Sequence, residues 1–205
     1  HRVVNIDKCG YASIDKNNVI FKRYKKYKLF KYSIGNKKKI TEILSKYNPD
    51  FIVNFAAETH VDNSINSPLR FIKNNISDYA NFLFSIQRVY EKMHIKKKNK
   101  FRIIHISTDE VYGSLKSKEK SFSEKNKFLP NSPYSASKAS SDMISRAWYQ
   151  TFDLPIIITN CSNNYGQYQH KEKFIPKIII NILKKKKIPV YAEGKNIREW
   201  LHALD

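Results

Sequence analysis

Two adjacent acidic residues follow a predicted buried strand, where an ionised side chain is energetically unfavourable. In ISTDEVYG, residues 106–113, Asp109 and Glu110 come directly after FRIIHIS, residues 101–107, whose mostly apolar pattern predicts a buried strand. A carboxylate held away from water is strongly destabilising unless it is paired, bound to a metal or neutralised. Two such groups at one strand end therefore need partners or a catalytic role. The alternative interpretation is a turn in which both carboxylates are hydrated.

A second stretch, NSPYSASK at residues 131–138, could supply a base. Ser132 is a plausible helix N-cap and Pro133 suits the first helical position, so Tyr134 and Lys138 stand one turn apart on one face. A phenol that acts as a base near neutrality must lose roughly three units of pKa, or about 4 kcal/mol. An ammonium at about 4 Å contributes on that order at an effective dielectric near 20. Taken alone, the spacing is more common on helix surfaces.

The elements that must position these residues alternate along the chain. Strands are predicted at residues 2–7, 29–32, 51–55, 102–107 and 155–160, with helices at 37–47, 68–91 and 133–152. This order predicts an α/β fold, a doubly wound parallel (Rossmann-like) sheet that binds ligands at the carboxyl ends of its strands. Asp109 and Glu110 lie at such an end.

The pattern changes after Asn160. An Asn-rich loop, a helix at 174–183 and a short strand at 188–191 follow. We expect residues 1–160 to form a cofactor-binding domain and 161–205 the start of a smaller substrate-binding region. The chain enters a strand-like run at once and lacks an initial Met, so a fragment without the first βα unit and the C-terminal part is expected.

Composition narrows the class of protein. Apolar residues make up 41% of the chain and aromatic residues 13%, which indicates a globular protein. No run of eighteen apolar residues is present, so no membrane span is expected. Cys9 and Cys161 fit no metal-ligand or redox spacing, which favours no metal site and a reducing, cytoplasmic location.

The formal charge of +20 could indicate a polyanion partner. Its lysines are scattered, however, with short clusters at 37–39, 96–98 and 184–187, and arginine is scarce. We interpret the excess as a solvated surface and expect no specific nucleic-acid partner.

Asp7 closes the first predicted strand. An acidic residue at that place in a doubly wound sheet typically binds the ribose hydroxyls of a dinucleotide. The glycine fingerprint that should precede it is absent from this sequence. A turn aspartate is therefore the competing interpretation.

Six blocks, taken in order, resemble one known family. They are NIDKCGYAS, NFAAETHVDNSI, HISTDEVYG, PNSPYSASKASSD, TNCSNNYGQY and IPVYAEGKNIREWLHALD, and they cover nearly the whole chain. Together they resemble the nucleotide-sugar 4,6-dehydratases of the extended short-chain dehydrogenase/reductase superfamily. Tyr134, Lys138 and Thr108 match the superfamily in general, whereas Asp109 and Glu110 together match the dehydratases.

The resemblance implies an NAD-dependent lyase with an internal redox cycle. NAD would oxidise the hexose at C4, with Tyr134 taking the hydroxyl proton, Lys138 lowering the pKa of Tyr134, and Thr108 bonding the same oxygen. Glu110 would then abstract the C5 proton while a protonated Asp109 donates to the departing C6 hydroxyl, and hydride would return to C6. The implied reaction turns dTDP-glucose into dTDP-4-keto-6-deoxy-glucose and water.

The same resemblance implies further binding residues. For the cofactor they are Asp7, Lys8, Cys9, Gly10, Ser33, Ile34, Phe55, Ala56, Ala57, Glu58, Thr59, Asn74, Tyr134, Lys138 and Asn164. For the substrate they are Thr59, Thr108, Asn163, Lys173, Phe174, Pro189, Val190, Tyr191 and Arg198. Ser33 stands where the family usually has Asp, Thr59 where it more often has Ser, and Asn74 where it usually has Thr.

Other functions stay open on the sequence alone. The sequence blocks that form the site do not distinguish one nucleotide base from another, so UDP-glucose is an alternative substrate. A nucleotide-sugar 4-epimerase or decarboxylase is disfavoured by the Asp109–Glu110 pair, and a basic, non-catalytic binding module is the alternative outside the enzymes. The resemblance also implies a homodimer built through the long helices, including 133–152.

Overall fold

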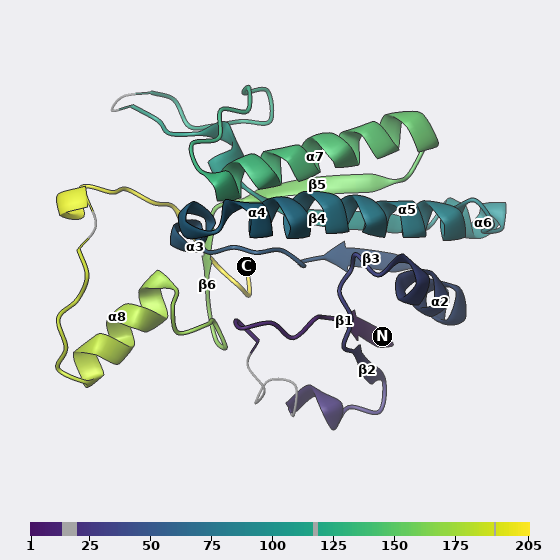
Figure 1. Cartoon of the computed structure of the whole chain (residues 1–205), viewed down its shortest axis with the longest axis horizontal. Coiled ribbons are helices and arrows are strands. Elements are labelled where there is room, and N and C mark those ends of the chain that lie inside the picture. Colours follow the sequence, from purple (N-terminus) through teal and green to yellow (C-terminus); the bar gives the residue numbers. More distant parts are fainter. Residues whose placement is uncertain (14–19, 117–118, 191) are drawn as a thin grey trace.

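Three strands form the centre of the molecule (Figure 1). The computed structural model describes residues 1–13, 20–116, 119–190 and 192–205. Strands β3 (Phe51–Asn54), β4 (Arg102–Thr108) and β5 (Ile156–Cys161) are parallel, with β4 in the middle. The apolar run that follows Phe101 thus becomes the central strand, which ends at Thr108. The parallel α/β fold is as predicted.

Two more parallel pairs flank this sheet. Strands β1 (Val3–Ile6) and β2 (Tyr27–Phe30) pair with each other, and so do β6 (Asn163–Tyr165) and β7 (Trp200–His202). Among the described residues the strands therefore form three separate sheets and not one. A cavity of about 230 Å³ lies where residues of β1, β3 and α2 face one another.

Helices pack along the central sheet (Figure 1). The helix α2 (Lys37–Tyr47) begins at Asn36, whose side chain accepts a hydrogen bond from the Lys39 N–H, and it ends at Asn48 in the left-handed conformation. The helix α7 (Pro133–Phe152) begins as predicted, with Ser132 as N-cap and Pro133 in the first turn, and Ser132 and Ser135 form a capping box. The bounds of both helices agree with the prediction.

The helix predicted at 68–91 is divided into three parts. An α-helical turn α4 (Pro68–Phe71) leads into a π-helix η1 (Ile72–Asp78), and α5 (Tyr79–Tyr90) follows. A π-helix is rare and is often found at functional sites. Its inward face here buries Asn74, Asn75 and Asp78.

The remaining elements are short, apart from α8 (Phe174–Leu183), which has the predicted bounds. They are α3 (Val61–Asn66), α6 (Ile95–Lys98), and the 3₁₀ turns η2 (Asp109–Tyr112) and η3 (Ala192–Gly194). No described helix is long and apolar enough to cross a membrane.

The strand predicted at 188–191 is wrong in its described part. Residues 188–190 have no regular structure, and Tyr191 lies outside the described residues. Pro189 has no N–H to give to a strand ladder, and Val190 is 71% exposed, so neither pairing nor burial favours a strand there. The short strands β6 and β7 were not predicted, because three residues are too few to show the alternation of a strand.

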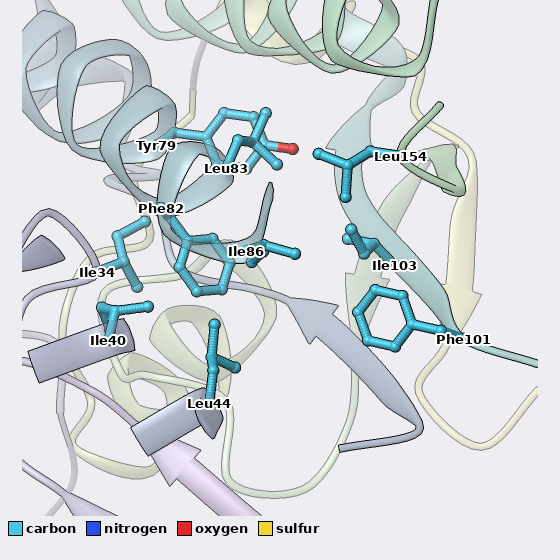
Figure 2. Close-up of a cluster of buried hydrophobic side chains, with 10 residues drawn as sticks. All are labelled: Ile34, Ile40, Leu44, Tyr79, Phe82, Leu83, Ile86, Phe101, Ile103 and Leu154. Carbon is cyan, nitrogen blue, oxygen red and sulfur yellow. The ribbon is translucent and has the colours of Figure 1, made fainter. Parts of the chain in front are cut away.

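The main core fills the space between α2, α5 and the central sheet (Figure 2). Its buried residues are Ile34, Ile40, Leu44, Tyr79, Phe82, Leu83, Ile86, Phe101, Ile103 and Leu154. A smaller cluster of Val111, Tyr112 and Ala139 packs η2 against α7. That cluster fixes the turn after β4 beside the first turns of α7.

Candidate active site

The turn after β4 holds the two acidic residues. Thr108 caps η2, because its Oγ1 accepts a hydrogen bond from the Glu110 N–H at 3.3 Å. The same hydroxyl donates to Asp109 Oδ1 at 3.3 Å. Val111 and Tyr112 are buried and anchor the turn, so Asp109 and Glu110 are held half-buried at the end of the central strand.

Helix α7 supplies the phenol and the ammonium. Tyr134 is buried, and its ring meets Phe71 edge to face with centroids 6.4 Å apart. Lys138 is 3% exposed, and its ammonium donates to the carbonyl oxygen of Ile106 at 2.8 Å. Burial raises the pKa of Tyr134, and Thr108, at the end of β4, partly opposes this effect.

The predicted lowering of the Tyr134 pKa by Lys138 is not found in this structure. Burial raises the pKa of Tyr134 far above its ordinary value, and the charges of Glu110 and Asp109 raise it further. The Lys138 ammonium is directed to the Ile106 carbonyl. The reason is physical: in the chain alone the phenol sits in a dry site and faces two carboxylates.

The surroundings of Asp109 and Glu110 favour the protonated form of both carboxyls. Burial raises the pKa of Asp109 above its usual range, against a smaller lowering by Thr108 and Arg198. Burial also raises the pKa of Glu110; the Asp109 charge adds to this, while Arg198 and Lys173 oppose it. Like charges held close favour a state in which one carboxyl is neutral and the other ionised.

Two of the predicted substrate cations act on these acids. Lys173, the residue before α8, donates from Nζ to the carbonyl oxygen and to Oγ1 of Thr59, both at 3.1 Å. Burial lowers the pKa of Lys173, and the charges of Glu172 and Glu110 partly offset this. The charge of Arg198, close to β7 in the chain, reaches both Asp109 and Glu110. The ring of Phe174 stacks on the ring of Trp200, with the two centroids 6.1 Å apart.

The predicted cofactor residues after β1 and β3 are brought together. Lys8 donates from Nζ to Glu58 Oε1 at 2.6 Å and to Asn74 Oδ1 at 2.9 Å. Arg70 donates to the other oxygen of Glu58 at 2.9 Å. Burial alone would raise the pKa of Glu58, but the bonds from Lys8 and Arg70 outweigh it and hold the pKa below its ordinary value.

Asn75 of the π-helix fixes the segment after β3. Its Nδ2 donates to the Glu58 carbonyl at 3.0 Å and to Ser137 Oγ at 2.9 Å. Its Oδ1 accepts from the Glu58 N–H at 2.8 Å and from Asn74 at 3.0 Å. One buried amide therefore ties residues 55–59 to α7.

The remaining cofactor-side residues lie at strand ends. Asp7 follows β1, and its Oδ1 accepts from the Cys9 N–H at 2.6 Å, which closes a tight turn toward Gly10. Ser33 follows β2 and donates from Oγ to Asp78 Oδ2 at 3.3 Å. Ile34 is a member of the main core. After β3, Phe55 is exposed and Ala56 donates its N–H to Asn54, with Ala57 next in the chain.

The structure leaves some predicted binding residues apart. Asn163, predicted for the substrate, and Asn164, predicted for the cofactor, lie in β6, where the side chain of Asn164 donates to the Ser162 carbonyl. Pro189 and Val190 belong to the irregular segment after α8, and no hydrogen bond or ion pair joins them to the acids among the described residues. Tyr191 cannot be placed, as it lies outside those residues.

Sequence reasoning missed a layer of buried and partly buried polar residues behind the site. The layer contains Asn54, His105, Ser107, Ser141, Asp142 and Asn160. Asp142 stands four residues after Lys138, so the helical spacing that linked Tyr134 to Lys138 could also have indicated it.

Comparisons with known proteins agree on one family. The family model described as GDP-mannose 4,6 dehydratase matches residues 1–205. The dTDP-glucose 4,6-dehydratase of Salmonella typhimurium is 43% identical over 99% of this chain and 58% of its own length. That of Haemophilus influenzae is 43% identical over 99% of this chain and 60% of its own length. The chain thus spans about three fifths of these relatives.

Solved structures give the same result. The dTDP-glucose 4,6-dehydratase from Streptomyces venezuelae, solved with NAD and TYD bound, has a TM-score of 0.88 and 37% identity over 98% of this chain and 58% of its own. A UDP-glucuronic acid 4-epimerase from Bacillus cereus, with a TM-score of 0.84 but 22% identity over 98% of this chain and 61% of its own, shows the shared fold. The chain therefore belongs to the GDP-mannose 4,6 dehydratase family, and the relatives described here, at 37–43% identity, are dTDP-glucose 4,6-dehydratases.

Proposed function

We propose that the protein containing this chain is an NAD-dependent hydro-lyase that converts dTDP-glucose into dTDP-4-keto-6-deoxy-glucose and water. One observation carries the proposal: Thr108, Asp109 and Glu110 at the end of β4 face Tyr134 at the start of α7. Two acids and a phenol around one strand end are what an elimination next to a transient ketone requires. The dTDP-glucose 4,6-dehydratases that are 41–43% identical to this chain support this choice of reaction.

The residues after β1 and β3 fit NAD. The Asp7 carboxylate, fixed at the end of β1 by the Cys9 N–H, suits the ribose hydroxyls, and the small Ala56 and Ala57 after β3 leave room for a flat ligand. Lys138 and Tyr134 lie at the carboxyl end of β4. NAD would supply the temporary removal of hydride from C4 and its return at C6.

The side chains of this chain would move the protons. Tyr134 accepts the C4 hydroxyl proton, and Thr108 bonds the same oxygen. Glu110 takes the proton from C5 and gives it back there when hydride returns to C6, while Asp109, whose pKa burial raises, donates to the C6 hydroxyl as it leaves. The pKa of Tyr134 must fall when ligands bind, and Lys138, one turn away, is the cation that can lower it.

Turnover by the protein expressed from its complete gene tests this function. We expect a keto-deoxy product from dTDP-glucose and a much slower reaction with UDP-glucose. Faster turnover of UDP-glucose would support that alternative substrate. A C4 epimer formed without loss of water would instead indicate an epimerase, and salt-sensitive nucleic-acid binding without turnover would indicate a binding module.

We also propose a homodimer, a cytoplasmic location and two domains divided near Asn160. Large apolar side chains on α7, among them Met143 and Tyr149, are half exposed and suit a helix-to-helix interface. Both cysteines are free, as a reducing compartment favours. The β6–β7 pair forms its own sheet beyond the main one, which supports the division. Light scattering of the complete protein measures the oligomeric state.

A further inference from the structure

A fully buried carboxylate lies behind the active site. Asp142 on α7 is 0% exposed and stands one turn after Lys138. Its Oδ2 accepts hydrogen bonds from Ser107 Oγ at 2.8 Å and from Asn160 Nδ2 at 3.2 Å. Its Oδ1 is buried and accepts no hydrogen bond from the described residues. An ionised carboxylate in such a place needs a positive partner.

His105 of β4 does not provide that charge. Its Nε2 is 3.4 Å from Asp142 Oδ1, yet burial lowers the pKa of His105 below its ordinary value, against a raising effect of Asp142. Its ring contacts suit a neutral imidazole: Nδ1 lies 3.1 Å from Asn54 Nδ2, and Nε2 lies 3.1 Å from Ser141 Oγ, whose own proton goes to the Lys138 carbonyl.

The other titratable groups against this layer are also uncharged. Tyr79 of α5 stacks on His105 at 4.3 Å and shares a 2.7 Å hydrogen bond with Ser145, and burial raises its pKa far above the ordinary value. Burial also raises the pKa of Tyr134 and that of Tyr112, whose hydroxyl donates to Asn160 Oδ1 at 3.4 Å. Lys138, one turn before Asp142 on α7, is the cation that remains; its ammonium donates to the Ile106 carbonyl, so Asp142 acts on it through space and not by direct contact. Burial lowers its pKa to about 8, and Asp142 opposes that effect.

We propose that Asp142 is a positioning residue of the active site, whose buried carboxylate is the counter-ion of the Lys138 ammonium and holds the ends of β4 and β5 behind Thr108. The bonds to Ser107 and Asn160 place it directly under the strand end that carries the acids. Its catalytic consequence rests on the proposed function, whereas the pairing with Lys138 does not.

A double-mutant cycle on thermal unfolding of the complete protein tests the pairing without any ligand. Lys138→Met and Asp142→Asn each leave one buried charge without its partner, so each lowers the melting temperature. The double variant removes both charges, and we expect it to melt well above the value that the sum of the two losses gives. If Asp142→Asn alone does not fold, the double variant still folds. Additive losses, or a double variant that is less stable still, overturn the proposal.

Ser145→Ala is the matched control. Ser145 lies in the same layer on the same helix and bonds Tyr79 and the Ser141 carbonyl. Combined with Lys138→Met, it should give additive losses. Coupling as large as that of Asp142 would show that the cycle reports general packing and would overturn the specific pairing.

A pH profile tests the effect on the reaction. Removing the Asp142 charge makes Lys138 easier to deprotonate, so Asp142→Asn should shift the alkaline limb of kcat down by about one unit or more. Ser145→Ala should leave that limb in place. An unshifted limb in Asp142→Asn contradicts the positioning role. A wild-type protein that fails to dehydrate dTDP-glucose contradicts the proposed function instead and leaves the unfolding cycle valid.

Discussion

The half-buried carboxyls of Asp109 and Glu110 affect the stability of the fold as well as the chemistry of the site. Burial raises the pKa of both, so each carboxyl binds its proton more tightly in the folded than in the unfolded chain. Stability from such groups is lost as the pH rises above about 4 and through the raised pKa. At neutral pH the two charges therefore lower the free energy of unfolding.

We accordingly expect Asp109→Asn and Glu110→Gln to raise the melting temperature at pH 7 while they lower turnover by about 10²–10⁴-fold. The gain in stability should vanish below about pH 4, where the wild-type carboxyls are also neutral. Thermal unfolding at pH 7 and pH 4, together with product formation, measures both effects.

Glu42→Gln is the control, because Glu42 is exposed and the hydrogen bond from Lys39 lowers its pKa. This variant should gain nothing at pH 7. Equal gains for all three variants would show that net charge, not burial of the two acids, sets the effect.

The sequence could predict the residues of the site better than their interactions. The spacing of Tyr134 and Lys138 and the position of Asp109 and Glu110 after a strand were enough to place them near one another. The direction of the Tyr134 pKa was not predictable, because it depends on how deeply the phenol is buried and on where the Lys138 ammonium points.

At the scale of elements, the π-helix η1 decides how the segment after β3 is held. It presents Asn75 to Glu58 on one side and to Ser137 of α7 on the other. We expect Asn75→Ala to lower the free energy of unfolding by about 2–4 kcal/mol, because several buried polar groups lose their partner at once. Chemical denaturation measures the change.

Ser140→Ala provides the comparison, since Ser140 bonds only the Ala136 carbonyl of its own helix among the described residues. It should cost less than about 0.5 kcal/mol. Similar losses for both variants would show that Asn75 does not bind the two elements together.

Elements with strong local signals were predictable and weak ones were not. The apolar spacing of α2, the N-cap of α7 and the apolar run of β4 gave the bounds or came within a residue of them. A π-turn inside 68–91 leaves the apolar periodicity almost unchanged, so the sequence predicted one continuous helix. The residues at 188–191 suggested a strand, but among the described residues no strand pairs with 188–190.

At the scale of the whole molecule, the lysine excess is a surface property. The side chains of Lys184 to Lys187 are exposed. Changing all four to Gln should leave turnover unchanged and the melting temperature within about 2 °C, since exposed substitutions away from specific contacts have small effects. Calorimetry and a steady-state assay measure these quantities. A large loss of turnover would contradict our interpretation of the charge as a solvated surface.

Arg198, near the C-terminal end of the described residues, acts electrostatically on the two acids at the end of β4. Its positive charge now lowers the proton affinity of both Asp109 and Glu110. A diphosphate that binds the guanidinium brings its own negative charge and cancels that influence. Binding of the sugar nucleotide would then raise the pKa of Asp109 further, so the substrate itself would help to keep protonated the acid that donates to its departing hydroxyl.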